Sequence, residues 1–356
     1  MSGVFDFAVN ADAEGILEIL ESDVAQGAIR ILYTRRDNPL ESYAKESEKS
    51  VVGVIRSNGR VSATVTCIPR KVYLEEKSCM LSYVTGYKKR KDEKTVINWY
   101  DAFEKMYHAT ECDLYFCSVV TENENVLNML HKKRKYMPYA IPIDTYYTYI
   151  FSPQAHVHGI NRKLIFRQAV REDEEAMLCF YHTYGSHKNL FPVIDSPDFI
   201  TGLDISDYYI LSDGAEILAV GALFDRSDCK QYLVKEYAGY MKLLRILNPL
   251  ISLLGYVDIP KENVPFSFVF LSFFLAKDDS EIYYRTFLSH ILKIAASKYS
   301  MVILGTNEHN PKKRILDSVH HISFSTQLNE INLMGISGKD IPQYDKKNIE
   351  VECALL

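Results

Sequence analysis

A basic run in the first third of the sequence could hold an anion. Residues 88–94 contain five basic and two acidic side chains and lead into Thr95, after which the pattern is that of an amphipathic helix. A helix N-terminus presents free backbone N–H groups and the positive end of the helix dipole, so flanking Lys and Arg favour a phosphate site there. The alternative interpretation of such a run is a solvated loop.

A second stretch, residues 119–136, holds groups that could move a proton. Glu122 ends an expected strand, Asn123 opens the next expected helix, and Tyr136 follows the basic cluster at 132–135. A carboxylate can serve as a base and a phenol as an acid when either lies against the reacting group. Glu122 could instead cap the helix, and His131 reads more simply as a helix residue that faces solvent.

The elements that must position these residues alternate between strand and helix. An amphipathic helix is predicted over residues 11–21, and Asn58-Gly59 predicts a hairpin because both residues tolerate positive φ. Further strands are predicted at 78–87 and 113–120, a helix capped by Thr95 at 96–108, and another helix at 122–135.

The chain is long enough for two domains, and its pattern repeats. Residues 152–163 have the composition of a linker, which divides the chain into domains at 1–151 and 164–335 and a tail at 336–356. The second domain repeats the strand, helix and hairpin order of the first, with a predicted helical insertion at about 233–257.

Composition excludes several classes of function. The net charge of −5 gives no basic face for nucleic acid. Neither a secretory signal nor an apolar stretch of membrane-spanning length is present, so a cytoplasmic protein without membrane contact is expected. No His or Cys spacing predicts a metal site.

With these residues in place, the chain resembles the GNAT superfamily of N-acetyltransferases, as two tandem GNAT-like α/β domains of which the second is degenerate. Residues 81–87 resemble the family's fourth strand, and residues 88–95 its pyrophosphate turn without the usual glycines. Residues 119–127 resemble its fifth strand and the asparagine that contacts the pantetheine arm. The resemblance implies a mixed, mostly antiparallel sheet in each domain, flanked by helices and opened between those two strands for acyl-CoA.

The resemblance further implies an acyltransferase (EC 2.3.1.-) that moves an acetyl group from acetyl-CoA, without a metal, to a small-molecule or peptide amine. An amide N–H near Val84 or Thr85 would polarise the thioester carbonyl. The implied cofactor-binding residues are Val84, Thr85, Gly86, Lys88, Lys89, Arg90, Lys91, Thr95 and Asn123.

Three catalytic candidates follow from the same resemblance. Leu130 stands where the family often has the tyrosine that protonates the departing thiolate, so Tyr136 is taken as its substitute. Glu122 is the candidate base, and Tyr83 on the fourth strand is a further candidate.

Two other functions stay open. A degenerate tandem GNAT could bind a ligand or partner without catalysis, since the glycine motif and the usual tyrosine are both missing. A Fem-type aminoacyltransferase also joins two GNAT-like halves, but the acidic net charge and the absence of a coiled-coil arm disfavour it. The oligomeric state stays open between a monomer and a homodimer.

Overall fold

A computed structural model describes residues 3–22, 29–91, 97–133, 138–248, 256–332 and 346–356. We call residues 3–151 the N-terminal half and residues 164–356 the C-terminal half. The strands of the N-terminal half are β1 (Val4–Phe7), β2 (Ile29–Thr34), β3 (Val51–Ser57), β4 (Arg60–Leu74), β5 (Lys77–Lys89), β6 (Leu114–Val120) and β7 (Tyr139–Phe151). Its helices are α1 (Ala13–Glu21), α2 (Pro39–Glu46), α3 (Trp99–Thr110) and α4 (Glu124–His131).

The C-terminal half repeats much of this order. Its strands are β8 (Ile165–Gln168), β9 (Tyr208–Ser212), β10 (Ile217–Phe224), β11 (Gln231–Tyr237), β12 (Phe268–Ala276), β13 (Met301–Asn307) and β14 (His321–Asn332). Its helices are α5 (Glu174–Phe180), α6 (Met241–Ile246), α8 (Glu281–Ala295) and α9 (Lys312–Asp317). Among the described residues, no helix combines the length and the apolar character that crossing a bilayer requires.

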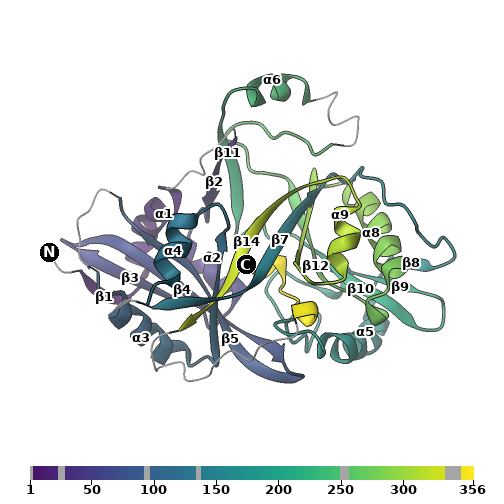
Figure 1. Cartoon of the computed structure of the whole chain (residues 1–356), viewed down its shortest axis with the longest axis horizontal. Helices are drawn as coiled ribbons and strands as arrows, with labels where there is room; N and C mark the ends of the chain where they lie inside the picture. Colours follow the sequence, from purple (N-terminus) through teal and green to yellow (C-terminus); the bar gives the residue numbers. More distant parts are fainter. Residues whose placement is uncertain (1–2, 23–28, 92–96, 134–137, 249–255, 333–345) are drawn as a thin grey trace.

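Twelve of the strands form one sheet in the order β1-β3-β4-β5-β6-β14-β7-β13-β12-β10-β9-β8. Neighbouring strands are antiparallel except for the parallel pairs β5–β6 and β12–β13. The remaining two strands, β2 and β11, pair with each other and project from one end of the molecule (Figure 1). The predicted fold class, a mixed and mostly antiparallel sheet flanked by helices, is confirmed.

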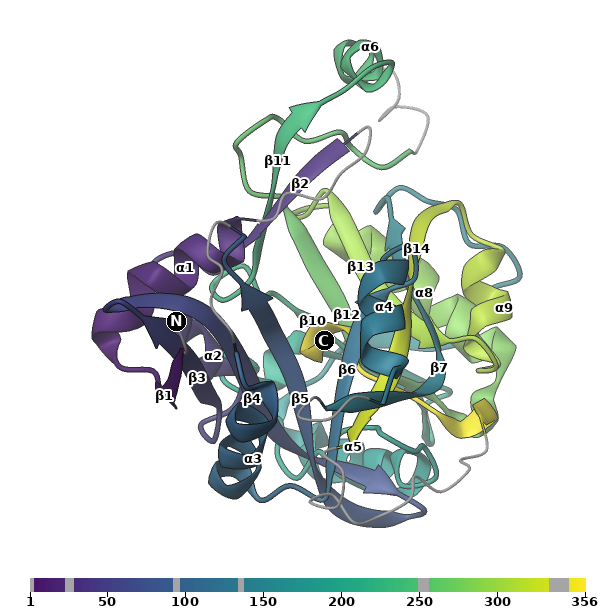
Figure 2. The same cartoon turned by 60° about the vertical axis from the view of Figure 1, so that its left-hand side comes forward.

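The two halves exchange their last strands. β14 of the C-terminal half pairs with β6 of the N-terminal half, while β7 of the N-terminal half pairs with β13 of the C-terminal half. β7 and β14 also pair with each other over most of their length, and both figures show them crossing the middle of the molecule (Figures 1 and 2). Each half therefore completes the sheet of the other.

Three clusters of buried apolar side chains surround the sheet. One packs α3 and α4 against the N-terminal strands, and a second packs α8 and α9 against the C-terminal strands. The third and largest lies between the halves and joins α1, α2 and α5 to residues 349–355. Because this central cluster draws on both halves, the space between them is part of the folded core.

Helix α3 begins three residues later than predicted. It begins at Trp99, and Asn98 caps it by accepting a hydrogen bond from the Asp101 N–H. Its buried face is formed by Trp99, Phe103 and Met106. The predicted cap at Thr95 is therefore replaced by Asn98, a residue type that caps helices at least as well, and Thr95 itself lies outside the described residues.

Helix α2 was not predicted, although its start carries a known signal. Asn38 accepts a hydrogen bond from the Leu40 N–H, and Pro39 occupies the first helical position. The helix buries Pro39, Ser42, Tyr43 and Glu46, so half of its buried residues are polar. Hydrophobic periodicity cannot reveal a helix whose inward side chains are stabilised by charged partners far away in the sequence.

The predicted helical insertion at 233–257 begins as a strand. Residues Gln231–Tyr237 form β11, which pairs with β2, and helix α6 follows at Met241–Ile246. A bulge between Val234 and Glu236 shifts the strand's phase, so its buried residues fall at 233, 234 and 237. That spacing resembles the periodicity of a helix, which explains why residues 233–237 were predicted to be helical, whereas α6 does lie within the predicted insertion.

The end of the chain, predicted as a tail, is buried between β12 and β13. The Tyr146 hydroxyl donates to the Val351 carbonyl at 3.0 Å, and Lys312 pairs with Glu350 at 2.8 Å. The backbone N–H of Phe273 donates to the Glu352 carboxylate at 2.6 Å. Residues 349–355 are therefore an integral part of the central cluster between the halves (Figure 1).

Burial of Glu352 predicts a pH-dependent stability. Burial raises the pKa of Glu352 to about 7, above the value of about 4.5 that it has when unfolded. The folded state then holds more protons between these values, so this group's stabilisation is present below about pH 4.5 and is lost as pH rises through 7. We expect the free energy of unfolding to fall by up to about 3 kcal/mol over this window.

Glu352→Gln is the matched variant, because its amide oxygen can still accept from Phe273 but does not titrate. Urea unfolding measured at steps between pH 4 and 8 should show a flatter profile for the variant than for the wild type. Parallel profiles for the two proteins would refute a titrating Glu352.

Candidate functional site

The strands β5 and β6 separate after a short region of pairing. Only Leu81, Ser82 and Tyr83 of β5 are in register with β6 among the described residues, opposite 114–116. Beyond that point β5 continues to Lys89, and β6 pairs on its other side with β14. Figure 2 shows the two strands forming a V. The predicted divergence of these two strands is therefore present.

A β-bulge lies on β5 at the mouth of this opening. Thr85 is opposite Thr66 and Lys88 is opposite Thr64, so Gly86 and Tyr87 share one partner residue on β4. Gly86 has φ of 61°. A bulge leaves one residue outside the regular ladder, and its positive φ turns the Gly86 peptide relative to its neighbours. The predicted N–H donors at Val84 and Thr85 lie instead in the regular part of the strand.

The C-terminal half contains the same geometry. β12 and β13 also pair over three residues, 268–270 with 301–303, and then separate. A bulge follows at Phe273, three residues after the last pair, as Gly86 follows Tyr83. Phe273 has φ of 53°, and its N–H binds the Glu352 carboxylate. In this half the bulge donor is thus satisfied by an oxygen of the chain itself.

Tyr83 bridges the start of the N-terminal opening. Its hydroxyl lies 2.8 Å from the Ser118 hydroxyl on β6. Burial raises the pKa of Tyr83 to about 12, so the phenol remains protonated at neutral pH. The structure places this candidate where the two strands diverge, between the opening and the centre of the molecule.

The basic run is partly engaged with α1. Lys88 donates to the Leu20 carbonyl at 3.0 Å, and the Arg90 side chain contacts Glu18 and donates to the Val61 carbonyl at 2.8 Å. Lys89 and Lys91 complete the described part of the run. These contacts give Lys88 and Arg90 a structural role in joining β5 to α1 and β4.

Helix α4 runs from Glu124 to His131, within the predicted range 122–135. Asn123 is its N-cap and accepts from the Val126 N–H at 3.4 Å. Leu130 is buried, and Val126 and Met129 pack against the same cluster. Glu122 is exposed next to this cap. The substitute acid Tyr136 lies outside the described residues.

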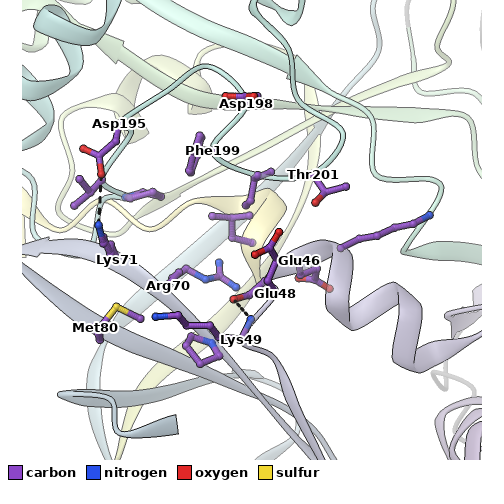
Figure 3. Close-up of a pocket in the computed structure, with 17 residues that line it drawn as sticks. Glu46, Glu48, Lys49, Arg70, Lys71, Met80, Asp195, Asp198, Phe199 and Thr201 are labelled. Atoms are coloured by element: carbon purple, nitrogen blue, oxygen red, sulfur yellow. Dashed lines mark hydrogen bonds and ion pairs between the residues drawn. The ribbon is translucent and has the colours of Figure 1, made fainter. Parts of the chain in front are cut away.

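A cavity of about 390 Å³ lies between the two halves. Its walls come from α2 and β4 on one side and from residues 192–201 on the other (Figure 3). Arg70 and Glu46 line it, together with the apolar side chains of Phe199 and Leu355. Sequence reasoning missed this site, whose residues lie far apart in the chain.

Buried charges lie behind the cavity wall. Glu46 pairs with Arg35 at 2.5 Å and with Lys230 at 3.2 Å, and all three side chains are almost completely buried. Burial alone would raise the pKa of Glu46, but the adjacent cations, Arg35 foremost, lower it to about 2. Burial lowers the pKa of Lys230 to about 8. We call Arg35, Glu46, Arg70, Arg226 and Lys230 the central charge cluster.

No described group of three or more His, Cys, Asp and Glu side chains could hold a metal ion. No protein-family model matches the sequence, and no curated protein does.

Comparison with solved structures identifies the fold. A structure of N-myristoyltransferase from Saccharomyces cerevisiae with bound myristoyl-CoA matches with a TM-score of 0.57 and 9% identity, over 99% of this chain and 85% of that one. A second structure of that enzyme has a TM-score of 0.56 with 9% identity, over 98% and 89% of the two chains. A GCN5-related N-acetyltransferase from Kribbella flavida has a TM-score of 0.51 and 10% identity, over 92% and 71%. The chain therefore has the GNAT fold that its sequence resembles.

The pairing of Glu46 with two cations predicts a large effect of removing its charge. Glu46→Gln leaves Arg35 and Lys230 buried without a carboxylate, which costs about 3–5 kcal/mol at pH 7. The difference from wild type should shrink as pH falls from about 4.5 towards 2, because the wild-type carboxyl is then protonated as well. Chemical unfolding measures both effects.

The exposed Glu48→Gln is the control and should change stability by less than about 0.5 kcal/mol. Equal stabilities for the two variants would contradict this role of Glu46.

Proposed function

We propose that this protein is an acyl-CoA-dependent N-acyltransferase that binds its donor in the N-terminal half. The observation that carries the proposal is the pair of matching openings. In the C-terminal half, residues 349–356 occupy the space beside the bulge, and the Phe273 N–H of the bulge donates to Glu352. In the N-terminal half, the corresponding bulge residue is Gly86. The carboxylate on Phe273 shows that such a bulge N–H can hold an oxygen, so Gly86 offers a donor for a thioester carbonyl.

The reaction would be a direct transfer. The amine nitrogen of the acceptor attacks the thioester carbonyl carbon, and the Gly86 N–H stabilises the oxyanion that forms. The C–S bond then breaks, the thiolate takes a proton from an acid, and the amine nitrogen gives up its proton to water or a base. Tyr83 and Tyr136 are the candidate acids, and Glu122 is the candidate base.

The acyl group is proposed to be acetyl. The hollow beside the point where β5 and β6 meet, lined by Leu81, Leu114 and Phe116, holds only about 10 Å³. That is room for about one water and not for a long chain. Acetyl-CoA is the donor with the shortest common acyl group.

Gly86 gives the first test. A side chain at this position would meet the Tyr43 hydroxyl at 3.0 Å and would force a positive φ on a branched residue. We expect Gly86→Val to weaken acetyl-CoA binding at least tenfold in calorimetry, because the bulge and its N–H would shift. Gly59→Val is the matched control, since Gly59 has φ of 76° and open space around it. The control should lose stability but keep its affinity, and equal affinities in both variants would refute the site.

The proton donor gives the second test. Tyr83→Phe removes the hydroxyl at the diverging strands while leaving the ring in place, and Tyr136→Phe does the same at the other candidate. Whichever tyrosine is the acid, its replacement by Phe should leave the affinity for acetyl-CoA unchanged and lower kcat by about 10²-fold or more. Full activity in both variants would exclude a tyrosine acid.

A second candidate function is a GNAT-fold protein that binds a ligand without catalysis. It is favoured by the contacts of Lys88 and Arg90 with α1 and by the buried Leu130. Acetyl-CoA binding without CoA release, over a panel of amines, would support it over the transferase.

A further inference from the structure

We infer that the cavity between the halves binds the carboxylate of the acceptor, so that the acceptor is a small amine that also carries a carboxylate. This assignment rests on the proposed acyl transfer for the role of the ligand, and on the central charge cluster for its chemistry. The cavity of about 390 Å³ falls within the range of small-molecule sites.

Two arginines of the cluster lack an anionic partner. Arg226 is fully buried, and only its Nη1 is bonded, to the Thr201 carbonyl at 3.1 Å. Among the described residues, Nε and Nη2 of both Arg226 and Arg70 have no hydrogen-bond partner. A buried guanidinium left in this state costs stability, so a ligand anion that reaches it gains a strong interaction.

The unpartnered atoms are of the kind that a carboxylate fits. Nε and Nη2 form one edge of the planar guanidinium, and that edge can donate two parallel hydrogen bonds to the two oxygens of one carboxylate. Both arginines keep this same edge unpartnered. Figure 3 shows Arg70 reaching from β4 towards the space between α2 and the loop with Asp195 and Thr201.

Among the described residues, no carboxylate forms an ion pair with Arg70 or Arg226. Glu46 is shared by Arg35 and Lys230. On the rim, Asp195 pairs with Lys71 at 3.7 Å, and Asp228 pairs with Lys45 at 3.0 Å. The inner arginines therefore remain in excess over the carboxylates that pair within the cluster, and a carboxylate entering the cavity would balance them.

The cavity is close enough to the bulge to serve the same ligand. Tyr43, whose hydroxyl faces Gly86, lies three residues before Glu46 on α2. Residues at this spacing share one face of a helix and are separated by about 5 Å along its axis. On the other side, the Arg70 guanidinium lies 6.0 Å from the Tyr83 ring, whose hydroxyl bridges the opening. A ligand held at Arg70 could thus extend its amine towards the thioester.

The test compares two probes that differ only at the acidic group. Glycylglycine carries an amine and a carboxylate, and glycylglycinamide replaces the carboxylate by an amide. We expect glycylglycine to bind wild-type protein at least tenfold more tightly in calorimetry without acyl-CoA. Arg70→Met should abolish this preference because Arg70 lines the cavity, and Arg226→Met, which removes a positive charge behind the cavity wall, should weaken it. Lys71→Met on the rim should retain the preference.

Thermal stability distinguishes a binding role of the two arginines from a structural role. Replacing a buried, unpartnered guanidinium by Met should leave the Tm unchanged or raise it, while a structural arginine would lower it. Equal binding of the two probes, preference for inorganic phosphate over glycylglycine, or a carboxylate preference that survives both Met substitutions would overturn the assignment. Acetyl-CoA binding is measured separately, so its loss with intact glycylglycine binding would refute the transferase and leave the carboxylate site standing.

Discussion

The exchange of the last strands is the constraint on which the rest of the molecule depends. β14 completes the sheet beside β6, and β7 completes it beside β13, so neither half can form its full set of backbone hydrogen bonds alone. β6 pairs with β14 over five residues but with β5 over only three, so the sheet stays continuous through β14 where β5 and β6 diverge. The central cavity has the same origin, since it lies where the two halves are held together.

Approximate symmetry makes the differences between the halves informative. Both contain a parallel pair of three residues followed, three positions later, by a bulge with positive φ. In the C-terminal half that position is Phe273, held by Glu352 and surrounded by the buried end of the chain. In the N-terminal half it is Gly86, the residue type that allows the closest approach of another group to the backbone. Similar backbones thus serve a structural role in one half and, as we propose, a binding role in the other.

Local signals predicted the parts of the fold that depend on local chemistry. Asn58-Gly59 formed its hairpin with φ of 52° and 76°, and Asn123 capped its helix. The parts of the fold that the sequence did not predict depend on partners that are distant in the sequence. Helix α2 turns Ser42 and Glu46 inward because Cys229, Arg35 and Lys230 receive them, and none of these contacts is visible in residues 37–50.

The candidate site likewise has parts that the sequence predicted and parts that it did not. The opening and its strands were predicted through resemblance of element order, but the bulge position was not, since no sequence pattern fixes where a strand gains a residue. The central charge cluster left no local signal either, because Arg70 lies within strand β4, Arg226 lies just after β10, and no local pattern shows that the two belong together.

Unpartnered charge in a core is unfavourable for folding and therefore informative about function. Arg35 and Lys230 both form ion pairs with Glu46, so these two cations have an anionic partner within the core. Arg70 and Arg226 add two guanidinium groups that the described structure does not neutralise, although a buried Met would fill similar space without desolvating a charge. A chain selected for stability alone has little reason to keep them beside a cavity. Burying these two charges lowers the stability of the folded protein. Their presence is explained if an anionic ligand that binds between the two halves offsets this loss.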